Sequence, residues 1–216
     1  MTAPDRRPHD RLSTEEEYLA LEQAAERRHE YVNGHVLAMA GADPNHELLC
    51  ASVTAALVTA LRGRPCFVFG SSMRVKVSAT GLYTYPDVSA LCGRPELEAT
   101  QPQTLLNPRV LVEVLSRSTE AYDRGAKFQH YGHVRALQEY VLVKPDGRYV
   151  ERYVRDGASW VYTSFTRPDD LVELPSIGAA LRVGDVYEQV DALDRPPPPP
   201  TPRLIREGTP PWTANV

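Results

Sequence analysis

Hydrophobic positions recur along this chain with two different periods, and each period predicts a different kind of element. Within residues 46–62, "HELLCASVTAALVTALR", apolar side chains stand four apart at Leu49, Val53, Leu57 and Leu61. This spacing puts them on one stripe of a helix, and an apolar stripe has to be covered by another element. We therefore expect a helix here that packs on a sheet.

Two local signals mark the first ordered elements. Ser13 and Thr14 stand three residues before Glu16 and Glu17, which is the arrangement of a capping box, so a helix is predicted from about Thr14 to Ala25. Residues 33–34, Asn-Gly, separate two short apolar runs, and both residue types tolerate the positive φ that a two-residue hairpin turn needs. Glu30 then lies on the first strand of the predicted hairpin.

Runs of β-branched and aromatic residues predict strands over much of the remaining chain. "CFVFGSSMRVKVS" is typical of a strand, or of a bent pair interrupted at Gly70, and "YPDVSAL" follows a turn at Gly81. "RVLVEVLS" has the composition of a buried strand. Residues 137–165 predict three antiparallel strands joined by Asp-Gly turns at 146–147 and 156–157.

A helix is expected between these strand regions, in "STEAYDRGAKFQHYGHV", opened by Ser118 or Thr119. The polar residues 1–11 predict a flexible arm, and residues 195–216 are rich in proline, which predicts an extended tail. The chain is thus expected to hold one domain, residues 12–194, between an arm and a tail.

Composition narrows the class of protein. The chain has 216 residues, of which 42% are hydrophobic and 24% charged, as in ordinary globular domains. A net charge of −4 argues against a broad basic surface for nucleic acid, although a local groove stays compatible with it. Cys50, Cys66 and Cys92 form no CxxC pair, so we expect reduced thiols and neither a zinc site nor a disulfide framework. With no signal peptide and no apolar run of roughly 18 residues, the expected location is the cytoplasm, with no membrane contact.

Candidate chemistry lies in "RVLVEVLS". Strand alternation places Leu111, Glu113 and Leu115 on one face, so the Glu113 carboxylate stands among apolar neighbours. Burial of an unpaired carboxylate is costly, so this group should either protonate or find a cation. Asp87 could supply a second carboxylate if the two strands are neighbours, and two carboxylates favour Mg²⁺. The alternative is that Glu113 pairs with an arginine while Asp87 only caps a strand end.

These segments resemble a known family. "YPDV", "NPRVLVEVLS", "STEAYDRGAKFQHY" and "QEYVLVKP" occur in the order found in the Uma-type restriction endonucleases of the PD-(D/E)XK nuclease superfamily. "HEYVNGHVLAM" and "NHELL" are similar to earlier segments of that family, and the resemblance spans about residues 12–190. It implies an α/β (α+β) fold with a mixed central sheet flanked by helices, with antiparallel hairpins added.

The resemblance also implies site residues. Asp87 matches the aspartate of the PD element and Glu113 the acid of the (D/E)XK element, whereas Leu115 stands where the general pattern has lysine. In this family the lysine lies on the following helix, and Lys127 matches it. Glu30 matches a glutamate that can add a metal ligand. His46 matches a recurrent histidine without an assigned role.

The implied activity is Mg²⁺-dependent hydrolysis of DNA phosphodiester bonds, with Mn²⁺ as a substitute ion. Asp87, Glu113 and the backbone carbonyl of Val114 would hold the ion, and Lys127 would orient the attacking water. The alternative for Lys127 is an ion pair with Asp123, four residues earlier, worth only about 0.3–0.5 kcal/mol on a helix surface.

Contacts to nucleic acid are harder to place. Arg74 and Lys76 could touch phosphates from a strand face, and Gln129 could contact substrate from the helix, although a solvated surface explains such residues as well. The expected partner is duplex DNA, with a homodimer to cut both strands. The alternative function is a catalytically inactive nuclease fold that binds nucleic acid or protein.

Overall fold

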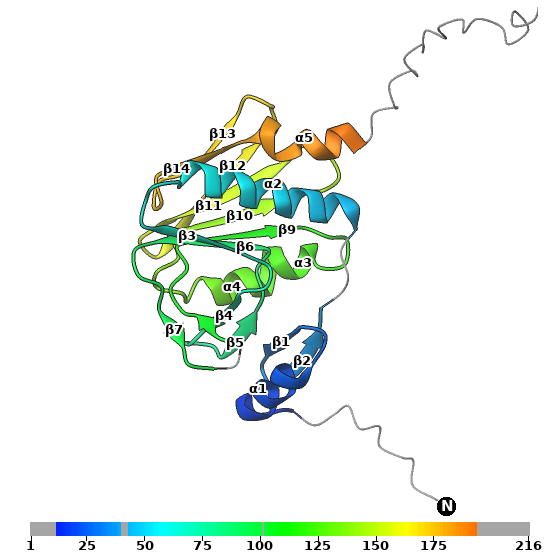
Figure 1. The fold of residues 1–216 in the computed structure, drawn as a ribbon, viewed down its shortest axis with the longest axis vertical. Helices are drawn as coiled ribbons and strands as arrows, with labels where there is room; N and C mark the ends of the chain where they lie inside the picture. Colours follow the sequence, from blue (N-terminus) through cyan, green and yellow to red (C-terminus); the bar gives the residue numbers. More distant parts are fainter. Residues whose placement is uncertain (1–11, 40–42, 101, 194–216) are drawn as a thin grey trace, which may run out of the picture.

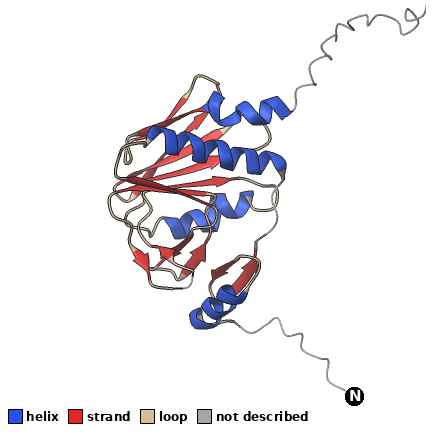
Figure 2. Cartoon of the chain, in the orientation of Figure 1, coloured by secondary structure: helices blue, strands red, loops and turns tan. Residues whose placement is uncertain are grey.

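The computed structural model describes residues 12–39, 43–100 and 102–193. The arm and the tail predicted at residues 1–11 and 195–216 lie outside the described residues. Between them, helices and strands follow one another in mixed order (Figures 1 and 2). The mixed α/β fold predicted from the sequence is confirmed.

A central sheet of six strands forms the middle layer, in the order β12-β11-β10-β9-β6-β3. Its strands are β3 (Cys66–Gly70), β6 (Val88–Cys92), β9 (Val110–Val114), β10 (Glu139–Val143), β11 (Val150–Asp156) and β12 (Ser159–Phe165). Strands β9 and β10 are parallel, while β10, β11 and β12 form the predicted antiparallel meander. The sheet is therefore mixed, as expected.

A second sheet has the order β2-β1-β5-β4-β8-β7. Its strands are β1 (His29–Val32), β2 (His35–Ala38), β4 (Arg74–Val77), β5 (Leu82–Thr84), β7 (Leu97–Glu98) and β8 (Thr104–Leu105). The bent pair predicted around Gly70 is thus two strands, β3 and β4, that belong to different sheets.

Helices cover both faces of the central sheet. The described helices are α1 (Glu15–Ala24), α2 (Pro44–Ala60), α3 (Glu120–Tyr122), α4 (Phe128–Tyr131) and α5 (Val183–Leu193), with a π-helical segment, η1 (Asp123–Lys127), between α3 and α4. Of these, α1 packs against β1 of the second sheet and not on the central sheet. Figure 1 shows α2 and α5 on one side of the sheet and α3 and α4 on the other. A small hairpin of β13 (Leu171–Leu174) and β14 (Ala179–Arg182) precedes α5. Neither this hairpin nor α5 was predicted from the sequence.

The hydrophobic core has two halves, one on each face of the central sheet. Val110, Val112 and Val114 of β9 pack with the apolar stripe of α2 and with α5. Leu111 and Leu115 face the other way, toward α4 and the second sheet. The alternation predicted for this strand is confirmed, and it leaves Glu113 on the α4 side.

The prediction of three reduced thiols is wrong for two of them. Cys66 and Cys92 face each other across the antiparallel pair β3–β6 and form a disulfide, while Cys50 is free. The two cysteines are 26 residues apart and form no sequence motif. Strand pairing brings them together, so the disulfide could not be predicted from their spacing. Within the described residues, no helix combines the length and apolarity needed to cross a membrane.

Candidate metal and catalytic site

Strand pairing brings the two predicted acids together. In the antiparallel pair β6–β9, Val88 lies opposite Val112, so one further step of the register places Asp87 opposite Glu113. The backbone N–H of Val114 donates a hydrogen bond of 2.7 Å to Asp87 Oδ2. Asp87 therefore does cap the start of a strand, and in the same position it presents its carboxylate to Glu113.

The predicted lysine reaches this pair from the helical layer. Lys127, at the end of η1, has its Nζ 3.0 Å from Glu113 Oε1 and 3.0 Å from Glu30 Oε1. Its Nζ also lies 3.4 Å from Asp123 Oδ1. The ion pair considered as an alternative thus exists, but it is buried and part of a larger cluster. The cation that pairs with Glu113 is this lysine and not an arginine.

Hydroxyl groups orient two of the carboxylates. Tyr131 donates a hydrogen bond of 2.7 Å to Glu113 Oε1, and Thr84 of β5 donates one to Glu30. Neither hydroxyl was assigned to the carboxylates from the sequence. The spacing of Tyr131, four residues after Lys127 on the helix, is the signal that could have placed both on one face.

Burial and charge oppose each other at the site. The pKa of Glu113 is raised to about 8, mainly by burial; the nearby Lys127 opposes this rise and the Asp87 carboxylate adds to it. Burial alone would depress the pKa of Lys127, but Glu113, Glu30 and Asp123 together hold it well above its usual value. The cluster thus has more carboxylates than cations, which favours a bound metal ion.

The available donors fit a hard divalent ion. Asp87 and Glu113 offer carboxylate oxygens, Val114 a backbone carbonyl, and Glu30 a third carboxylate, all facing or bordering one pocket of about 750 Å³. Mg²⁺ prefers such oxygen ligands and keeps several waters. The pocket has a size common for ligand sites, and exposed Arg117 lies at its rim. The sequence analysis missed Arg117, whose signal is its place in the loop directly after β9.

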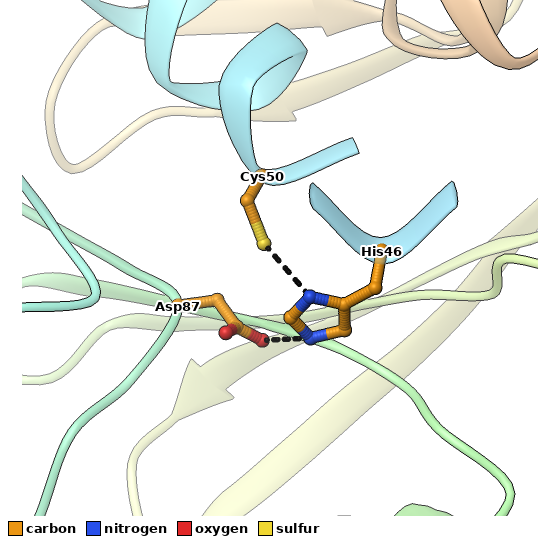
Figure 3. Close-up of side chains that lie close together, drawn as sticks. All are labelled: His46, Cys50 and Asp87. Atoms are coloured by element: carbon orange, nitrogen blue, oxygen red, sulfur yellow. Dashed lines mark hydrogen bonds and ion pairs between the residues drawn. The ribbon is translucent and has the colours of Figure 1, made fainter. Parts of the chain in front are cut away.

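His46 also lies at this pocket. It stands in the first turn of α2, where the Asp43 side chain accepts a hydrogen bond of 3.0 Å from its backbone N–H. Its Nε2 lies 3.4 Å from Asp87 Oδ2, and its Nδ1 lies 3.5 Å from Cys50 Sγ (Figure 3). Burial lowers the pKa of the imidazole, but the Asp87 carboxylate outweighs this effect, so that pKa is raised.

The three residues expected to contact nucleic acid are not brought to the site. Arg74 is fully buried and its guanidinium donates to Thr100, Thr104 and the Pro102 carbonyl. This burial contradicts a phosphate contact by Arg74, because the cation has no access to a ligand. Lys76 pairs with Glu15 and Glu98. Gln129 is exposed on α4 but does not line the pocket.

Comparisons with known proteins identify relatives of this chain. Residues 15–184 match the model of the Uma2 family, "Putative restriction endonuclease". Two Synechocystis proteins are similar over most of their length. The uncharacterized protein slr1290 is 37% identical over 83% of this chain and 93% of its own, and the uncharacterized protein sll1609 is 31% identical over 71% and 87%.

A solved structure shares the fold. It is the crystal structure of a "putative nuclease belonging to DUF820" from Anabaena variabilis, which is 21% identical, with a TM-score of 0.66 over 81% of this chain and 97% of its own. Because the family match covers most of the described residues, the chain belongs to the Uma2 family of restriction-endonuclease-like proteins.

Proposed function

We propose that this protein is a Mg²⁺-dependent endonuclease that hydrolyses phosphodiester bonds of duplex DNA. The observation that carries the proposal is the convergence of Asp87, Glu113 and Lys127, in which the lysine Nζ lies 3.0 Å from Glu113 Oε1. Membership of a restriction-endonuclease-like family supports a nucleic-acid substrate. The choice of DNA and of Mg²⁺ is part of the proposal.

Each residue has a role that follows from its position. Asp87, Glu113 and the Val114 carbonyl would hold the ion, with Glu30 beside them. When bound, Mg²⁺ stabilises charge on the phosphate and lowers the pKa of a coordinated water. Lys127 orients the attacking water and offsets the negative charge that grows on the phosphate. The exposed Arg117 at the rim of the pocket would contact the DNA backbone.

Cleavage of both strands needs two sites. A two-fold symmetric homodimer supplies two equivalent sites, and we include it in the proposal. Its signature is the release of linear plasmid, whereas a single site releases nicked circles first. Sedimentation of the purified chain measures the oligomeric state directly.

The test is cleavage of supercoiled plasmid with Mg²⁺ or Mn²⁺. Wild type should cleave, Asp87→Asn and Glu113→Gln should not, and Asp156→Asn, at an exposed aspartate at the end of β11, should cleave like wild type. Circular dichroism checks that each variant is folded, and a parallel assay on RNA tests the substrate class.

The proposal fails if wild type leaves every nucleic acid intact and calorimetry finds no Mn²⁺ binding. That result would identify the protein as an inactive nuclease fold that binds nucleic acid or protein.

A further inference from the structure

A second group of metal-ligand atoms lies beside Asp87, on the side away from Lys127's helix. His46, Cys50 and Asp87 each offer one ligand atom, and these atoms all lie within 4.8 Å of one another. His46 and Cys50 are four residues apart on α2, so they project from the same helix face toward the start of β6 (Figure 3). The group therefore combines a preformed pair on one helix with a carboxylate on the sheet.

The donor types differ from those of the Mg²⁺ site. An imidazole nitrogen, a thiol sulfur and a carboxylate oxygen suit Zn²⁺ better than Mg²⁺, which takes oxygen ligands. Tetrahedral Zn²⁺ with bonds of about 2.0–2.3 Å separates its ligands by roughly 3.3–3.8 Å. The observed separations are 3.4 Å from Asp87 Oδ2 to His46 Nε2 and 3.5 Å from Cys50 Sγ to His46 Nδ1.

One adjustment is needed for a single ion. The His46 ring turns a different nitrogen to each neighbour, and only one nitrogen can ligate the ion. The terminal torsion of histidine is broad, so rotation of the ring can bring one nitrogen to the edge between Cys50 and Asp87. His46 and Asp87 line the pocket, whereas Cys50 does not. A water molecule in the pocket would therefore be the fourth ligand of the ion.

We propose that His46, Cys50 and Asp87 bind one Zn²⁺ ion, and that this ion inhibits the nuclease by withdrawing Asp87 from the Mg²⁺ site. The spacing of the cysteines along the chain did not reveal the site, because its third ligand, Asp87, lies 37 positions after Cys50, directly before β6. Binding of the ion stands independently of the nuclease activity, whereas the inhibition rests on the proposed function.

Cadmium provides a direct test of binding, since its thiolate complexes have an ultraviolet charge-transfer band. Cys66 and Cys92 are joined in the disulfide, so in the full-length protein without reductant the band reports on Cys50. The band should saturate at one Cd²⁺ per chain, disappear on addition of Zn²⁺, and be absent from Cys50→Ser. His46→Gln should weaken Cd²⁺ binding by about tenfold or more, whereas His133→Gln, at an exposed histidine outside the group, should leave it unchanged.

Two results would overturn the site: no band in wild type, or a band that persists in Cys50→Ser. The inhibition is measured separately, as the Zn²⁺ concentration that halves Mg²⁺-dependent plasmid cleavage relative to each variant's own activity. Cys50→Ser should need about tenfold more Zn²⁺ than wild type. Equal sensitivity would overturn the inhibition. Cd²⁺ binding by a protein that cleaves nothing would leave the site in place and reject the nuclease.

Discussion

At the scale of single residues, the centre of the site is one buried lysine among three carboxylates. Each of these charges would be unstable in the interior alone, and the cluster forms because Lys127 contacts Glu113, Glu30 and Asp123 at the same time. The hydroxyl of Tyr131 satisfies a further lone pair of Glu113. Removal of the lysine would leave three carboxylates without their cation.

Lys127→Met should therefore destabilise the metal-free protein by about 3–5 kcal/mol, which urea unfolding at neutral pH measures. Lys144→Met, at the half-buried lysine that follows β10, is the matched control and should stay close to wild type. Adding Glu30→Gln to Lys127→Met should restore part of the loss, because one uncompensated carboxylate is then gone. A stability of Lys127→Met equal to that of wild type would contradict the cluster.

At the scale of elements, the β1–β2 hairpin carries Glu30 to the site, and its turn depends on two unusual residues. Asn33 and Gly34 have φ of 52° and 83°, as the predicted two-residue turn requires. A Cβ added to Gly34 would lie 2.9 Å from Leu12 Cβ, an atom close to the backbone. The position is thus constrained both by φ and by contact.

Gly34→Ala should destabilise the protein more than Gly157→Ala. Gly157 also has positive φ, at 59°, but no atom lies within 4 Å of an added Cβ there, so that variant reports the backbone cost alone, about 1–2 kcal/mol. Urea unfolding of both variants gives the difference that is due to Leu12. If both variants lose the same free energy of unfolding, Leu12 moves aside without destabilising the protein, and the contact does not constrain position 34.

Elements with a local signal could be predicted from the sequence, and elements that depend on distant partners could not. The capping box at Thr14 and the turn at 33–34 involve neighbours in the chain, and both are found as expected. The split of β3 and β4 between two sheets depends on pairing with β6 and β8. The sequence around Arg74 is typical of a solvated strand face. The residues that accept its hydrogen bonds, Thr100, Pro102 and Thr104, lie 26 to 30 positions later, so its burial could not be predicted locally.

At the scale of the whole molecule, the candidate site joins segments that are far apart in the chain. Glu30 belongs to the second sheet, Glu113 to β9 of the central sheet, Asp87 to the bend directly before the neighbouring strand β6, and Lys127 to the helical layer. The resemblance to a family named these residues. Of the two hydroxyls that orient their carboxylates, Tyr131 has a signal in its spacing after Lys127, whereas Thr84 follows only from the three-dimensional arrangement. A bound ion would link the layers to one another.

Mn²⁺ should accordingly raise the melting temperature. An ion at one hundred times its Kd stabilises the folded state by about 2.7 kcal/mol, provided the unfolded chain does not bind it. Asp87→Asn should abolish the shift. A potassium salt at equal ionic strength is the control, since screening alone can stabilise a cluster of like charges. A shift of the same size with potassium, or in Asp87→Asn, would reject specific binding.

The π-helical segment has a consequence for how the lysine is placed. Asp123 is the first residue of the widened turn and Lys127 the last, with Tyr131 beyond, and the last two side chains reach the same oxygen of Glu113. An α-helix rotates by about 100° for each residue, so deletion of one residue between Asp123 and Lys127 would change the phase between the two halves of the helix. The direction of the Lys127 side chain is thus set by the rotation of the helix and not by strand alternation. The position directly after β9 can therefore hold Leu115, an apolar core residue.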